Sequence, residues 1–94
     1  MESLKRKPKL ATGSFDLDSE TKIDYVGTSV GKLKAIANNK YLSDFDKGVQ
    51  YIAAKIQVNS QSVVADDILD CFSDVEFKRI ADFITEIEGG EKNA

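Results

Sequence analysis

Apolar residues recur at helical spacing near the C-terminal end of the chain. One face of the stretch 73–88 collects five of them: Phe77, Ile80, Ala81, Ile84 and Ile87. This spacing predicts an amphipathic helix. Ser73 followed three residues later by Glu76 matches a capping box at its start. The pair Gly89 and Gly90 predicts its end, because glycine readily adopts the left-handed conformation that closes helices.

Three further segments show the same period. Residues 64–72 carry an apolar stripe of Val64, Ile68, Leu69 and Phe72. Residues 43–57 carry Phe45, Val49, Ile52, Ala53 and Ile56, and residues 29–42 carry Val30, Leu33, Ile36 and Ala37. Ser43 and Ser29 stand where N-caps belong, since a serine hydroxyl accepts a hydrogen bond from the free amides of a first helical turn. Each segment therefore predicts a helix.

Residues 10–27 alternate apolar and polar positions instead. Phe15 and Leu17 flank one aspartate, and Ile23 and Tyr25 flank another. Period-two alternation predicts strands, and residues 19–21 between the two runs predict a β-hairpin. The expected fold is mainly α: a small bundle of three to four amphipathic helices with an N-terminal extended segment or β-hairpin.

The expected organisation is one helical domain over residues 10–90, preceded by a basic flexible arm (1–9) and followed by a polar tail (91–94). A chain of 94 residues suits one domain. We expect its core to be apolar residues from all four helices: Ile36, Phe45, Val49, Ile52, Ile56, Ile68, Leu69, Phe72, Phe77, Ile80 and Ile84.

Charge is unevenly distributed along the chain. The net charge is −3. Residues 1–9 hold four bases and one acid, a net of +3, whereas residues 61–94 hold three bases and nine acids, a net of −6. The acidic total argues against nucleic acid as the main partner. No apolar run approaches the ~20 residues of a membrane span, and the basic N-terminus is not followed by an apolar signal segment. A cytoplasmic protein is expected.

No motif predicts catalysis, a cofactor or a metal. The chain has no histidine and a single cysteine, Cys71, which its apolar neighbours predict to be a small buried packing residue. A calcium loop starting at Asp16 would need glycine at its sixth position, where Thr21 stands. The stretch from Gly27 to Lys32 has one residue too few between its glycines for a phosphate-binding loop. A non-enzymatic protein is expected.

The acidic C-terminal part is the predicted binding surface. Short amphipathic helices carry more apolar surface than they can bury among themselves, which favours self-association into a homo-oligomer or recognition of a partner helix. Six residues are candidate partner contacts: Tyr51, Asp66, Asp67, Asp70, Phe83 and Ile87. Tyr51 lies off its helix's main stripe, so it is either a boundary residue anchored by its hydroxyl or an exposed contact.

Residues 49–90 contain, in order, the apolar run Tyr51-Ile52-Ala53-Ala54-Lys55-Ile56, a polar connector, the acidic run Ala65-Asp66-Asp67-Ile68-Leu69 and a long predicted terminal helix. In this pattern they resemble the C-terminal half of tail assembly chaperones from long-tailed bacteriophages. The resemblance implies an oligomeric protein of the host cytoplasm that binds the tape-measure protein and shields it while tail-tube subunits assemble. The alternative is a small acidic inhibitor, such as an immunity protein or antitoxin, whose carboxylates block a basic site.

Overall fold

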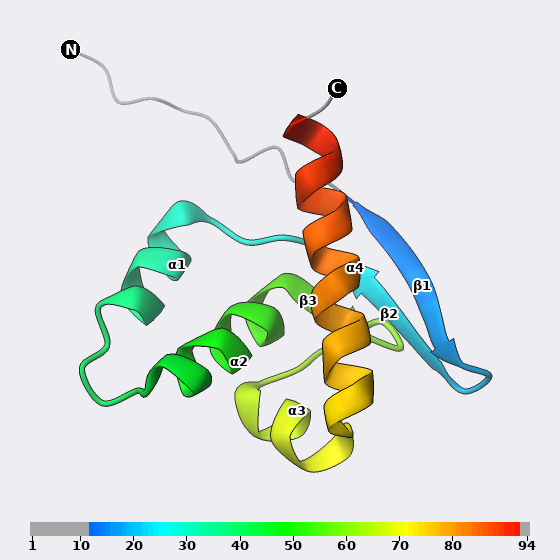
Figure 1. The fold of residues 1–94 in the computed structure, drawn as a ribbon, viewed down its shortest axis with the longest axis horizontal. Coiled ribbons are helices and arrows are strands. Elements are labelled where there is room, and N and C mark those ends of the chain that lie inside the picture. Colours follow the sequence, from blue (N-terminus) through cyan, green and yellow to red (C-terminus); the bar gives the residue numbers. More distant parts are fainter. Residues whose placement is uncertain (1–11, 93–94) are drawn as a thin grey trace.

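The computed structural model of the protein describes residues 12–92. Along the chain lie strands β1 (Gly13–Asp18) and β2 (Thr21–Tyr25), helices α1 (Val30–Ala37) and α2 (Asp44–Lys55), strands β3 (Ile56–Val58) and β4 (Gln61–Ser62), and helices α3 (Ala65–Cys71) and α4 (Asp74–Lys92). The predicted arm (residues 1–9) and the last two residues of the predicted tail lie outside the described residues. Figure 1 shows α4 as a long helix beside the sheet, with α1, α2 and α3 on its other side.

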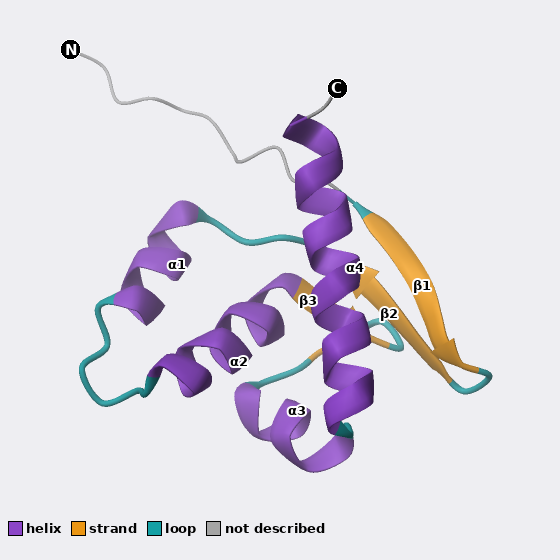
Figure 2. Ribbon diagram, viewed as in Figure 1, coloured by secondary structure: helices purple, strands orange, loops and turns teal. Residues whose placement is uncertain are grey.

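The mainly helical bundle was a wrong prediction. The described chain is an α+β fold, in which four strands form one antiparallel sheet in the order β1-β2-β3-β4 beside four helices (Figure 2). The predicted hairpin over residues 10–27 is confirmed as β1 and β2, with Phe15 opposite Ile23. The helix predicted over 43–57 instead ends at Lys55, and the chain turns directly into β3, which pairs with β2.

A two-residue turn explains why the sheet continues past β3. Val58 pairs with Gln61, so Asn59 and Ser60 form the loop between β3 and β4. Both residues have positive φ, 49° and 67°, as the type I′ hairpin turn requires. The side chain of Asn59 also accepts a 2.8 Å hydrogen bond from the Lys22 amide and donates to the Glu20 carbonyl at 3.1 Å. Asn59 thereby fastens the second hairpin to the first.

The core lies between α4, the inward face of the sheet and the helices α2 and α3. Its buried members are Leu17, Ile23, Tyr25, Val49, Ala53, Ile56, Ile68, Ile80 and Ile84. The first three come from the sheet and were absent from the predicted core. Among the residues predicted as core, Ile36 is buried apart from this cluster, Ile52, Phe72 and Phe77 are half-buried, and Phe45 and Leu69 are exposed.

A residue of α4 forms a hydrogen bond with β1 at a bulge in that strand. The register shifts between Asp16 and Asp18, which leaves Leu17 without a partner in β2. The guanidinium of Arg79 donates a 2.9 Å hydrogen bond to the Leu17 carbonyl and lies 5.8 Å from the centre of the Phe15 ring. Phe15 in turn packs on Phe83, with 4.5 Å between ring centres. These contacts fix α4 along β1.

Helix starts follow the sequence signals, whereas several helix ends do not. Ser29 and Ser43 cap α1 and α2, and Ser73 and Glu76 exchange hydrogen bonds of 3.2 and 2.9 Å, so the predicted capping box is confirmed. The predicted stop at Gly89 is wrong, because α4 continues to Lys92. Glycine costs about 1 kcal/mol relative to alanine in a helix but does not forbid one. Helix α1 is shorter than the predicted 29–42 and ends at Ala37.

Candidate functional site

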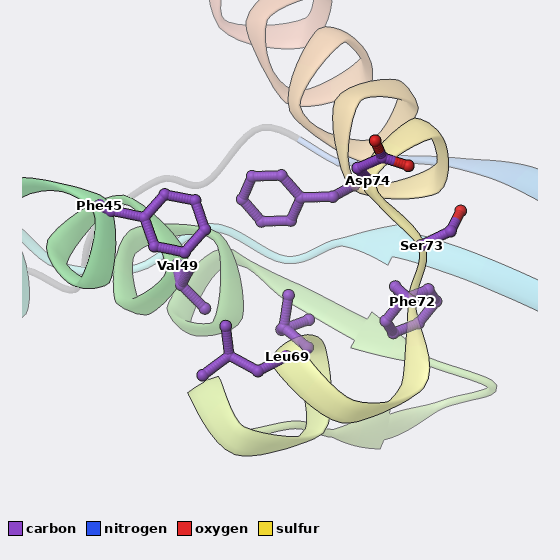
Figure 3. Close-up of a pocket in the computed structure, with 8 residues that line it drawn as sticks. Phe45, Val49, Leu69, Phe72, Ser73 and Asp74 are labelled. Atoms are coloured by element: carbon purple, nitrogen blue, oxygen red, sulfur yellow. The ribbon is translucent and has the colours of Figure 1, made fainter.

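An open apolar hollow lies where α2, α3 and the start of α4 meet. Its volume is about 240 Å³, and its lining is mostly hydrophobic: Phe45, Val49, Ile68, Leu69, Phe72 and Phe77, with Ser73 and Asp74 at a polar edge. Figure 3 shows Phe45 and Val49 of α2 and Leu69 of α3 bordering the space between the helices, with Ser73 and Asp74 at its edge. We call this hollow the α2–α4 groove.

The corner between α3 and α4 forms one end of the groove. Phe72 is extended, with φ −124° and ψ 142°, so the chain leaves the helical path for two residues. The capping box of Ser73 and Glu76 then starts α4 in a new direction. This geometry places Phe72 and Phe77 on the same hollow from two different helices. The predicted corner at Ser73 is therefore what shapes the site.

Two large side chains of the groove remain exposed to solvent. Phe45 is 65% exposed and Leu69 is 49% exposed, although both lie on the apolar stripes of their helices. The ring of Phe45 lies 6.4 Å from that of Phe77, across the groove from α2 to α4. Fully burying a leucine or phenylalanine side chain is worth about 1.5–3 kcal/mol. Within the described part of the chain, no element covers Phe45 and Leu69 fully, so a partner that covered them would gain this free energy.

Several carboxylates lie on the helices that form this apolar surface, and one of them lines its edge. Asp66 and Asp70 are exposed on α3, and Asp66 lies three residues before Leu69, which places the two on neighbouring positions of the helix surface. Asp74 belongs to the groove edge. The sequence carries no lysine or arginine between Lys55 and Lys78. A partner with basic groups beside an apolar face would complement this rim.

The structure separates the six predicted contact residues. Asp66 and Asp70 are exposed on α3 and are not among the residues that line the groove, whereas Asp67 accepts a 3.0 Å hydrogen bond from the Val64 amide and so helps to start α3. Phe83 and Ile87 are half-buried against the core on the β1 side of α4. The sequence did not single out Phe45, Leu69, Phe72 and Phe77 as contacts, because their apolar periodicity assigned them to the core.

Tyr51 lies in a second, shallower hollow between α1 and α2. Its volume is about 490 Å³, and it is lined by Val30, Leu33, Lys34, Ala37, Tyr51 and Lys55. Tyr51 itself is half-buried, and Val30 is 81% exposed. Lys55 is held by Glu88, with 2.9 Å between Nζ and Oε2. The predicted contact Tyr51 therefore belongs to a different surface from Asp66 and Asp70.

The remaining chemistry of the described residues is sparse. Within residues 12–92 no three acidic or sulfur-bearing side chains converge as metal ligands would. Cys71, predicted to be a buried packing residue, is exposed instead. Among the described helices, none combines the length and apolar character needed to cross a membrane. The α2–α4 groove is the site that these residues present most clearly for binding.

Comparisons with protein-family models, with curated proteins and with solved structures found no match for this chain.

Proposed function

We propose that this protein is a non-enzymatic interaction module that binds an amphipathic helix of a partner protein in the α2–α4 groove. The observation that carries the proposal is the solvent exposure of Phe45 and Leu69 at the mouth of a hollow already lined by other apolar side chains. A helix laid into a hydrophobic groove is a recurring mode of recognition, in which three or four apolar anchors supply most of the affinity.

The partner we propose is the tape-measure protein of a long-tailed bacteriophage, and the module's role is that of a tail assembly chaperone. The resemblance of residues 49–90 supports this role, since that stretch contains all of α3, most of α4 and the second half of α2, although Phe45 lies before it. A long helical client exposes repeated apolar faces before its tube assembles. A groove that covers such a face would keep the client from aggregating.

The acidic rim gives the interaction its selectivity. Asp74 lies at the edge of the apolar lining, and Asp66 and Asp70 are exposed on α3, one of the helices that form it. A client segment with lysine or arginine next to its apolar positions is therefore preferred. Such exposed charges act mainly on the association rate and on the choice of partner, and salt screens them. We expect binding to weaken with added salt without being abolished, because apolar burial supplies the rest.

The proposal predicts that a long helical protein is encoded beside this chain, and co-expression with that protein tests it. We expect the client to stay soluble and to co-purify with the native chain, and to be lost with the double variant Phe45→Gln and Leu69→Gln. Val75→Gln is the matched control, because Val75 is 65% exposed and does not line the groove. Equal recovery of the client with the groove variant and with the control would contradict the proposal.

The small acidic inhibitor remains the second candidate, and the exposed carboxylates of Asp66 and Asp70 favour it. An inhibitor of this kind binds a basic site through charge. Its binding would fail in the variant Asp66→Asn and Asp70→Asn and would survive Leu69→Gln. The chaperone proposal expects the opposite order of sensitivity, so the two pairs of variants separate the candidates.

A further inference from the structure

Helix α1 is an incompletely covered element of the fold. It has eight residues, only Ile36 among them is buried, and Ile36 stands outside the main core cluster. Val30 at its start is 81% exposed, and Tyr41 in the following turn is 97% exposed. Helices shorter than about 12–15 residues are marginal on their own in water, so their stability comes from packing. Figure 1 shows α1 at the periphery, beside α2.

The charge of this segment is opposite to that of the groove rim. Lys32, Lys34 and Lys40 are its charged residues, and the sequence has no acid between Asp24 and Asp44. The charged residues between Lys55 and Lys78 are all acidic: Asp66, Asp67, Asp70, Asp74 and Glu76. One chain therefore carries both an apolar surface with cations and an apolar groove with anions.

We propose that the α2–α4 groove of one copy receives the α1 segment of a second copy. The docking surface, which we call the α1 face, consists of Val30, Leu33, Lys34, Ala37 and Tyr41. The first four of these form the α1 side of the open hollow between α1 and α2, and Tyr41 supplies an aromatic anchor of the kind that dominates interfaces. In the complex, Lys34 and Lys40 lie near Asp66, Asp70 and Asp74 of the other copy.

Charge complementarity favours a contact between unlike surfaces of two copies over a contact between two like surfaces. Two grooves brought together would oppose their carboxylates, and two α1 faces would oppose their lysines, each at a cost in free energy. Pairing of unlike surfaces avoids both costs. This inference goes beyond the proposed function, because it requires no client. If the client also uses the groove, the second copy and the client exclude one another.

Complementation between two defective variants tests the pairing. The groove variant carries Phe45→Gln and Leu69→Gln, and the α1 variant carries Val30→Asp and Tyr41→Ser. Asp at the first position of α1 favours the helix, since carboxylates stabilise helix N-termini. We expect the native chain to associate in sedimentation equilibrium and each variant to raise the dissociation constant about 30-fold, which corresponds to the loss of a strong interface anchor. An equimolar mixture of the two should form a one-to-one complex, because one intact groove meets one intact α1 face.

Charge reversal provides a second arm with a matched control. Asp70→Lys places a cation in the last turn of α3, where the helix dipole favours it, and we expect it to weaken association. Lys34→Glu in a second chain should restore association with that variant. Lys32→Glu is the control: Lys32 lines a different hollow of the molecule, and glutamate there would complete a capping box with Ser29. It should leave the dissociation constant unchanged.

Several outcomes would overturn the inference. They are a native chain that remains monomeric at high micromolar concentration, a groove variant or α1 variant that associates like the native chain, and a mixture that forms no complex although circular dichroism shows both variants folded. None of these bears on client binding, which is measured separately by co-purification with Val75→Gln as its control. Failure of self-association and failure of the chaperone role are thus distinguishable.

Discussion

The hydroxyl of Tyr25 donates a 2.7 Å hydrogen bond to Oε2 of Glu88, which joins the end of β2 to the last turns of α4. The same carboxylate oxygen accepts a 2.9 Å hydrogen bond from Lys55, the last residue of α2. Tyr25 is 7% exposed, and the Lys55 side chain is 17% exposed. One carboxylate therefore links the sheet and two helices at a place partly shielded from water, where such bonds are worth more than at the surface.

Replacement of Glu88 by alanine should destabilise the fold by about 1–3 kcal/mol, since it leaves a shielded hydroxyl and ammonium without this acceptor. Chemical denaturation measures the change. Glu86→Ala is the control, because Glu86 is an exposed residue of the same helix, and surface substitutions usually stay within about 0.5 kcal/mol. Equal losses in the two variants would show that Glu88 acts only through the helix itself.

Ser60→Gly should stabilise the protein. Ser60 has a φ of 67° in the turn between β3 and β4, and glycine adopts positive φ without the steric cost that other residues incur there. The gain expected from relieving this strain is about 1 kcal/mol, measured as a rise in the midpoint of urea unfolding. Asn59→Ala should lower the midpoint, because it removes the two side-chain hydrogen bonds to the first hairpin. A Ser60→Gly variant less stable than the native chain would contradict the assigned turn.

The loss of stability should differ sharply between Ile80→Ala and Leu69→Gln, although both replace aliphatic residues on predicted helix stripes. Ile80 is 0% exposed in the core, so its truncation should cost about 2–5 kcal/mol. Leu69 is 49% exposed, and its replacement should cost less than about 1 kcal/mol in the unassociated chain. Thermal unfolding at low protein concentration measures both. A large loss from Leu69→Gln would mean that the groove is closed in solution.

The turn between β1 and β2 should contribute a pH-dependent stability. The Glu20 amide donates a 2.8 Å hydrogen bond to Asp18, and this bond lowers the pKa of the carboxyl below its usual value of 3.8. A depressed pKa stabilises the fold above the unfolded-state pKa, and this contribution is lost as the pH falls through the folded-state value. The native chain should therefore exceed Asp18→Asn in melting temperature at neutral pH, and the gap should close below about pH 4. A gap that widens on acidification would refute the assignment.

The sequence predicted local structure well where the signal was long and self-contained. Phe15 to Tyr25 alternates over two full strands, and Ser73 with Glu76 forms its capping box within four residues. The signal for strand β3 was neither long nor self-contained. The strand has three residues, and Ile56 also continues the helical stripe of α2, so the pattern fitted a helix as well as a strand. Its pairing with β2 is a contact between distant parts of the chain, which local periodicity does not reveal.

The groove was missed for a related reason. Periodicity identifies which residues share a helix face, but it does not tell whether another element covers that face. Phe45 and Leu69 lie on stripes as regular as those of Val49 and Ile68, yet the second pair is buried and the first is exposed. The acidic character of α3 was visible in the sequence, and for this reason Asp66 and Asp70 were predicted as contacts while the apolar residues of the groove were not.

Strands β2 and β3 pair directly, so everything between them, from residue 26 to residue 55, is an excursion from the sheet. The entropy lost in closing such a loop grows only with the logarithm of its length, about 0.6 kcal/mol for each doubling. A few residues inserted after Asn38, beyond the C-cap of α1, should therefore leave the sheet intact. That position should accept a reporter peptide. Insertions and deletions that arise there during evolution should likewise be tolerated by the fold.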